Sequence, residues 1–308
     1  MHSNGIHIMN HSIDFILLNL GGKCVLNWAL VILQRNHICR SFVGIFSVSL
    51  TVIDTALTLI FTIIYLHGDG RCFLLGLQLT KYHICLLVQI IGEVYSVLQY
   101  PVVVMTGLDH FCTTSQRLQT ATSRLKGIFK SFVSIILWYL AFLYIFLLSD
   151  FLPVLEDVSH HQIYQCWIFH VFQILQVAML MFLTLGSAAF FTRCSPRLFK
   201  NPRQVNQITD QSRSDSRRSV VSQALGIFLN TWAIFLFFLA ALLVLPVGIP
   251  SYLGLNVAWL CFLNSFLIGV VLCVVCPDSK LAQGLAAVPP DSFCEWKFKF
   301  SLAKEDSA

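Results

Sequence analysis

Seven stretches of the chain are apolar for long enough to cross a lipid bilayer, and this pattern constrains the fold more than any other feature. A spanning helix needs about 20 mostly apolar residues. Only 11% of the residues are charged, whereas ordinary soluble domains carry about 25%, so lipid must cover the surplus apolar surface. The sequence therefore predicts an all-α membrane protein, a seven-transmembrane helix bundle. The stretches run approximately over residues 13–33, 42–66, 82–112, 128–148, 163–192, 220–245 and 252–275.

The distribution of lysine and arginine predicts the orientation of this bundle. If the N-terminus is outside, seventeen of these residues fall in cytoplasmic segments and only Arg71 and Lys81 fall on the other side. Basic residues concentrate in cytoplasmic loops, so we expect the N-terminus outside and the C-terminus inside. The net charge of +5 then reflects membrane topology, and no nucleic-acid partner is expected. The expected divisions are an extracellular tail over 1–12, a membrane domain over 13–275 with a basic cytoplasmic loop over 193–219, and a cytoplasmic tail over 276–308.

Three of the eleven cysteines reach the oxidising side in this topology, where disulfides form. We expect Cys85 to pair with Cys166, which would tie the third helix to the loop before the fifth. The alternatives are that Cys72 takes one of these places, or that both residues are buried small hydrophobes. The sequon at Asn10 also falls outside, which predicts glycosylation; the alternative is a chance occurrence of the three-residue motif.

Several polar residues lie inside the predicted spans, where an ionised group is costly. Asp54 falls near the middle of the second stretch, and Asn27, Gln99 and Asn264 fall at comparable depths in the first, third and seventh. These four could form one buried hydrogen-bonded cluster, with a proton or a small cation neutralising the carboxylate. The alternative is that they only hold helices together, without a switching role.

Glu93 lies nearer the outer end of the third stretch, where a bundle could open into a ligand pocket. A carboxylate there suits a cationic or polar ligand. The alternative is that Glu93 pairs with Lys23 or with Arg71. The candidate pocket residues are Gln89, Glu93, Tyr95 and Trp259.

No catalytic signature is present, since HExxH, GxSxG, GxGxxG and GxxxxGK[ST] are all absent. The adjacent pair His160 and His161 is better explained by a solvated loop than by a metal site. We therefore expect no enzyme activity, no cofactor and no metal centre.

A series of single residues, one or two in each span, resembles the rhodopsin-like G-protein-coupled receptors. Each residue is weak support alone, but eight at compatible spacings are fairly specific. The series is Asn27, the run Leu50-Thr51-Val52-Ile53-Asp54, Cys85, Asp109, Trp138, Cys166, Trp232 and Asn264. The resemblance implies a seven-helix receptor with a switch at Asp109 and His110 and a toggle at Trp232.

The chain departs from that family in three motifs. Where the family has Asp-Arg-Tyr, this chain has Asp109-His110-Phe111, so the arginine that meets the G protein is missing. Where the family has Asn-Pro-x-x-Tyr, the proline and tyrosine after Asn264 are absent, and Ile234 replaces the proline that follows Trp232. Each loss removes a device for helix movement or transducer contact.

We interpret the chain as an orphan-like receptor in the plasma membrane, with an unknown extracellular ligand and with a heterotrimeric G protein or another cytoplasmic transducer as partner. A non-signalling scaffold or trafficking partner is the alternative that the altered motifs permit. A transporter or channel would need a continuous polar path, against which the few ionisable groups in the later helices argue. In the tail, Cys294 lies among aromatics and lysines. This segment either lies at the membrane surface with Cys294 acylated, or it is disordered.

Overall fold

The computed structural model describes residues 8–36, 38, 41–67, 72–74, 77–114, 123–148, 165–171, 173–198, 208–245, 248–275 and 293–294. Its contacts divide the chain into two compact units. The first comprises residues 1–106, 120–175 and 245–261, and the second comprises residues 107–119, 176–244 and 262–308. Each unit is described on its own below.

Five helices in the described parts are long and apolar enough to cross a membrane. Two further helices, α5 (Gln173–Leu198) and α8 (Val257–Val275), carry shorter described apolar segments, over Ile174–Ser187 and Val257–Val271, and α7 (Ser251–Gly254) is a single turn. The first two helices coincide with the predicted stretches. The five long helices are α1 (Ile13–Leu33), α2 (Phe42–Leu66), α3 (Lys81–Thr114), α4 (Ser123–Leu147) and α6 (Ile208–Val244).

Serine hydroxyls cap the first two helices. Ser12 accepts a hydrogen bond from the backbone N–H of Phe15 at 3.3 Å, and Ser41 accepts one from Gly44 at 3.0 Å. Each hydroxyl satisfies one of the N–H groups that a helix start leaves without a partner. Gly44 also allows a close approach of the chain, because a Cβ there would overlap the backbone of Ile38.

The helices have an inverted polarity compared with those of a water-soluble protein. On α1, Leu18 and Val25 are exposed, whereas Lys23 and Asn27 are buried. On α6, Ile234 is 88% exposed although it lies in the middle of an apolar helix. Apolar side chains outside and polar ones inside are stable only where the surrounding medium is lipid. The chain is a multi-pass membrane protein.

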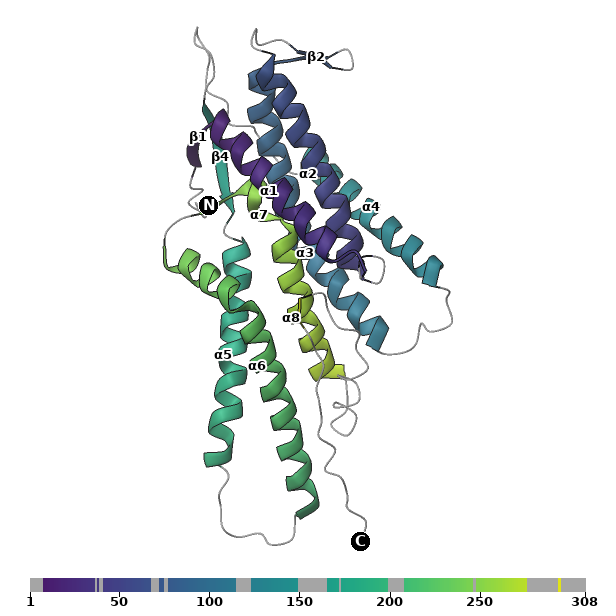
Figure 1. Cartoon of the computed structure of the whole chain (residues 1–308), viewed down its shortest axis with the longest axis vertical. Helices are drawn as coiled ribbons and strands as arrows, with labels where there is room; N and C mark the ends of the chain where they lie inside the picture. The colour runs from purple at the N-terminus through teal and green to yellow at the C-terminus, as the bar shows by residue number, and fades with distance from the viewer. Residues whose placement is uncertain are drawn as a thin grey trace. The chain divides into compact units, whose positions relative to one another are not determined.

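Two small antiparallel sheets accompany the helices of the first unit. Strands β1 (Ile8–Ser12), β4 (Gln165–Val171) and β5 (Ile249–Pro250) form one sheet in the order β1-β4-β5, and β2 (Cys72–Leu74) pairs with β3 (Leu77–Leu79). Figure 1 shows β1 and β4 beside the start of α1.

Strand β4 corrects the predicted fifth span, which was expected to start near residue 163. The seven residues Gln165–Val171 are extended, and α5 begins only at Gln173. A short apolar run cannot be assigned to helix or strand by periodicity alone. Here pairing with β1 on one side and β5 on the other decides in favour of the strand.

The helices on either side of the predicted basic loop over 193–219 reach far into it. Helix α5 continues to Leu198 and α6 already begins at Ile208. No glycine or proline interrupts residues 208–219, so the charged segment can extend the helix beyond the apolar span.

The disulfide expected between Cys85 and Cys166 is present. Its Cα atoms lie 5.3 Å apart, and it joins the first turns of α3 to strand β4 across 81 positions of sequence. Both cysteines are buried. The bond fixes β4, and through it the sheet, to the N-terminal end of α3.

Candidate functional site

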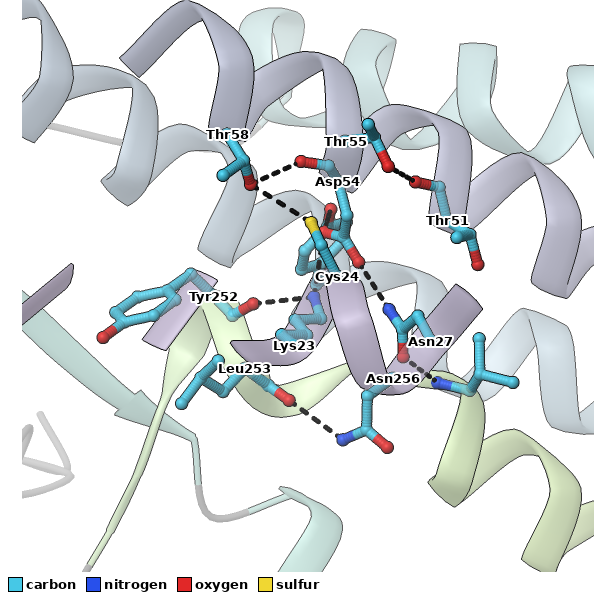
Figure 2. Close-up of polar contacts among 12 residues, drawn as sticks. Lys23, Cys24, Asn27, Thr51, Asp54, Thr55, Thr58, Tyr252, Leu253 and Asn256 are labelled. Atoms are coloured by element: carbon cyan, nitrogen blue, oxygen red, sulfur yellow. Dashed lines mark hydrogen bonds and ion pairs between the residues drawn. The ribbon is translucent and has the colours of Figure 1, made fainter. Parts of the chain in front are cut away.

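A buried ion pair between Lys23 and Asp54 lies at the centre of the first unit. The ammonium nitrogen of Lys23, on α1, is 3.0 Å from Oδ1 of Asp54, on α2. Only 3% of the lysine side chain and none of the aspartate side chain is exposed. Figure 2 shows the two side chains meeting between their helices.

Two further donors satisfy the Asp54 carboxylate. The Asn27 amide donates to Oδ2 at 2.9 Å, and the Tyr95 hydroxyl, from α3, donates to Oδ1 at 2.5 Å. With Lys23, the carboxylate thus accepts hydrogen bonds from three side chains. The carboxylate of α2 is thus bound by donors from both α1 and α3.

The Lys23 ammonium is also held by groups other than Asp54. It donates to the backbone carbonyl of Tyr252 at 2.9 Å and lies 4.2 Å from the centre of the Tyr95 ring. A cation over an aromatic face is attracted by the ring quadrupole. The lysine therefore joins α7 to the same centre.

Asn27 extends the centre to the start of α8. Its side-chain oxygen accepts a hydrogen bond from the backbone N–H of Val257 at 3.0 Å (Figure 2). On the other side, Gly92 of α3 allows α7 to approach closely, because a Cβ there would overlap the Ser251 hydroxyl. We call Lys23, Asn27, Asp54 and Tyr95 the polar centre.

A buried ion pair is compatible with a stable fold only when both charged partners are present and in contact. Transferring each charge from water into the interior costs several kcal/mol, and removal of one partner from a buried pair typically destabilises a protein by about 3–5 kcal/mol. The additional hydrogen bonds offset part of that cost. The polar centre thus favours the one packing in which all its partners meet.

The structure brings together only part of the cluster predicted around Asp54. Asn27 contacts Asp54 as expected, but Gln99 is buried and neither of its side-chain polar atoms has a hydrogen-bond partner among the described residues. Asn264 makes its hydrogen bond in the second unit. The sequence left open which cation neutralises Asp54, and in the structure it is the ammonium group of Lys23. A lysine within an otherwise apolar stretch was the sequence feature that could have indicated this pairing.

The residues predicted to form a ligand pocket have different environments. Tyr95 is fully buried and belongs to the polar centre. Gln89 and Trp259 are also buried, whereas Glu93 is half-buried. The alternative partner Lys23 is engaged in an ion pair with Asp54.

In the second unit, His110 of α3 is joined to Asn264 of α8. The Nε2–H of His110 donates to the Asn264 side-chain oxygen at 3.0 Å. Asp109 beside it is partly exposed. The sequence pointed to Asp109, His110 and Asn264 separately, and only the structure shows that the last two meet.

Trp232 of α6 lies in an aromatic cluster of the same unit. Its ring centre is 5.8 Å from that of Phe235, 5.5 Å from that of Phe262 on α8 and 5.7 Å from that of Phe293 in the tail. Cys294, the predicted acylation site, is fully buried next to Phe293. An acyl chain on that thiol would require this segment to separate from α6.

The glycosylation site predicted at Asn10 falls on strand β1. The backbone of Asn10 is opposite Trp167 of β4. Glycosylation at this residue remains a prediction.

Comparisons with known proteins give relatives along almost the whole chain, although no family model matches it. It is 28% identical over 306 residues to a Homo sapiens protein named probable G-protein coupled receptor 160, covering 95% of this chain and 87% of that one. The Mus musculus protein of the same name is 28% identical over 302 residues, covering 92% and 87%. The Rattus norvegicus protein is 30% identical over 300 residues, also covering 92% and 87%.

The hydrogen bond from Tyr95 to Asp54 can be tested by removing a single hydroxyl. Tyr95→Phe should destabilise the purified protein in detergent by about 1.5–3 kcal/mol, because a bond to a charged group is lost at a buried site. Tyr252→Phe is the matched control, since Lys23 contacts its backbone and its hydroxyl only meets the Asn19 amide at 3.4 Å. Equal melting temperatures for the two variants would contradict the described contact.

Proposed function

Because the chain belongs to the family of the probable G-protein coupled receptor 160 proteins, we propose that it is a plasma-membrane receptor of seven transmembrane helices that passes an extracellular signal to a cytoplasmic transducer. The observation that carries this proposal is the similarity to named receptors over more than nine-tenths of the chain. These relatives are receptors and not enzymes. An extracellular ligand and a heterotrimeric G protein are the partners that their name implies.

Seven spans follow if α5 and α8 cross the membrane together with the five long helices. Their apolar segments are Ile174–Ser187 and Val257–Val271, and α5 reaches 26 residues in all. The positive-inside rule then puts the N-terminus and the sheet β1-β4-β5 outside, and the basic ends of α5 and α6 inside.

Signal transfer in this proposal is a change between two packings of the helices. A ligand can shift such an equilibrium only by its difference in affinity for the two states. The polar centre favours the packing seen here, because separation of α1 from α2 would leave Lys23 and Asp54 as unpaired buried charges. The half-buried Glu93 remains our candidate for contact with a cationic or polar ligand.

The cytoplasmic part of the switch would consist of His110 with Asn264 and of the aromatic cluster around Trp232. The hydrogen bond between His110 and Asn264 holds α3 to α8. Movement of α6 would have to separate Trp232 from Phe262 and Phe293. Both sets of contacts must rearrange before a transducer could bind between these helices.

The alternative function, a non-signalling scaffold, has one specific observation in its favour. The residue that the receptor family uses to contact the G protein is His110 here, and its ring nitrogen is directed at Asn264. A chain that had lost coupling could keep its fold and bind partner proteins through its basic loops. Signalling measurements distinguish the two functions.

Topology can be tested with epitope tags in intact and permeabilised cells. A tag inserted between residues 199 and 207, and a second one at the C-terminus, should both be stained only after permeabilisation. A tag before Ile8 should be stained in intact cells. Staining of the first tag in intact cells would mean that α5 does not cross, and staining of the C-terminal tag would mean that α8 does not.

Coupling can be tested with a His110→Arg variant, which restores the residue type of the receptor family. At matched surface expression and without added ligand, we expect this variant to gain basal G-protein signalling over the wild type. His110→Gln is the control, because an amide can still donate to Asn264 but carries no charge. Silence of all three would favour the scaffold, and equal activity of all three would show that coupling does not depend on this position.

A further inference from the structure

Two histidines from different strands lie close together in the sheet β1-β4-β5. The ring centres of His11, on β1, and His170, on β4, are 6.2 Å apart and their planes are tilted by 46°. The function proposed above uses neither residue. They are separated by 159 positions in the sequence and meet only because β1 pairs with β4.

Three of the four ring nitrogens are buried without a hydrogen-bond partner among the described residues. They are Nε2 of His11 and both Nδ1 and Nε2 of His170. Leaving a polar atom unsatisfied in a buried position is costly, and native structures rarely do so without a reason. One such reason is a metal-binding site, in which the ring nitrogens are the ligands of a bound ion.

The separation of the rings suits a shared transition-metal ion. A Zn–N bond is about 2.1 Å and a ring centre lies roughly 1.1 Å behind its nitrogen, so two rings on one ion have centres at most about 6.4 Å apart. The observed 6.2 Å is within that limit. A tetrahedral N–Zn–N angle would place the two ring centres roughly 5 Å apart, so zinc binding would draw the rings together by about 1 Å.

Both rings are held in place by their surroundings. Phe15 stacks on His11, with ring centres 5.3 Å apart and planes within 9°. A Cβ on Gly248 would overlap the His170 ring, so the absence of a side chain there makes room for the imidazole. In addition, His11 is opposite Cys166 in the strand register, next to the disulfide.

We propose that His11 and His170 together bind a zinc ion, whose remaining positions are filled by water or by an anionic group of a ligand. Imidazole nitrogens suit borderline transition metals such as zinc, whereas magnesium and calcium take oxygen ligands. A bound ion would link β1 to β4 close to the disulfide that joins β4 to α3. In the proposed topology the site is extracellular, but the binding itself does not depend on that topology.

The test is a titration of the purified full-length protein, previously treated with chelator, with zinc chloride. Zinc should bind with a stoichiometry of one at this site, measured against a fluorescent chelator, and at a hundredfold excess over Kd it should raise the Tm by roughly 3 °C or more. His11→Gln and His170→Gln should each weaken the binding by at least about tenfold. Magnesium chloride should produce no shift.

Two matched controls separate this site from other zinc ligands in the chain. His83→Gln removes an imidazole whose Nδ1 already accepts a hydrogen bond from the Thr80 backbone at 3.0 Å, and the double variant His160→Gln/His161→Gln removes two at once. Both should keep the zinc-dependent shift. The proposal is overturned if the wild type shows no shift, or if either the His11 or the His170 variant binds zinc as tightly as the wild type. Since the two variants are independent, one that fails to fold leaves the other as the test.

Discussion

The buried ion pair between Lys23 and Asp54 is the interaction on which the packing of the first unit depends. A charge inside a bundle surrounded by lipid has no water to solvate it, so its partners must come from the chain itself. Here they come from α1, α2, α3 and α7, through Asn27, Tyr95 and the Tyr252 carbonyl. Any rearrangement that keeps both charges satisfied must move these elements together, and this turns a costly pair into a determinant of one specific packing.

The same constraint gives a physical basis for a switch. Apolar contacts between helices and lipid change little when a helix slides or rotates, because lipid is as apolar as the side chains that it replaces. Polar contacts are either made or broken, and so they separate one packing from another. The second unit has its own directional contact, from His110 to Asn264, beside the aromatic cluster of Trp232.

The sequence was sufficient for features that residue type and membrane topology decide. The ends of α1 and α2, the disulfide between Cys85 and Cys166, and the contact of Asn27 with Asp54 were all predicted. It was insufficient where several conformations or partners were open and only the three-dimensional packing selects one. Strand β4 lies in an apolar run whose helical or extended state is decided by pairing with β1 and β5. Lys23 was named only as an alternative partner of Glu93, and its pairing with Asp54 is seen only in three dimensions. Asn264 was grouped with Asp54 by depth alone, and its actual partner is His110.

The most direct test of the role of this ion pair is a double-mutant cycle on Lys23→Met and Asp54→Asn, with the unfolding free energy of the purified protein as the measured quantity. If the pair organises the packing, each single variant should lose about 3–5 kcal/mol, because it leaves the other group without its partner, and the double variant should recover much of that loss. The two effects would then be coupled by well over 1 kcal/mol. Single-variant losses that simply add in the double variant would contradict the account, since they would show that Lys23 and Asp54 contribute to stability independently of each other.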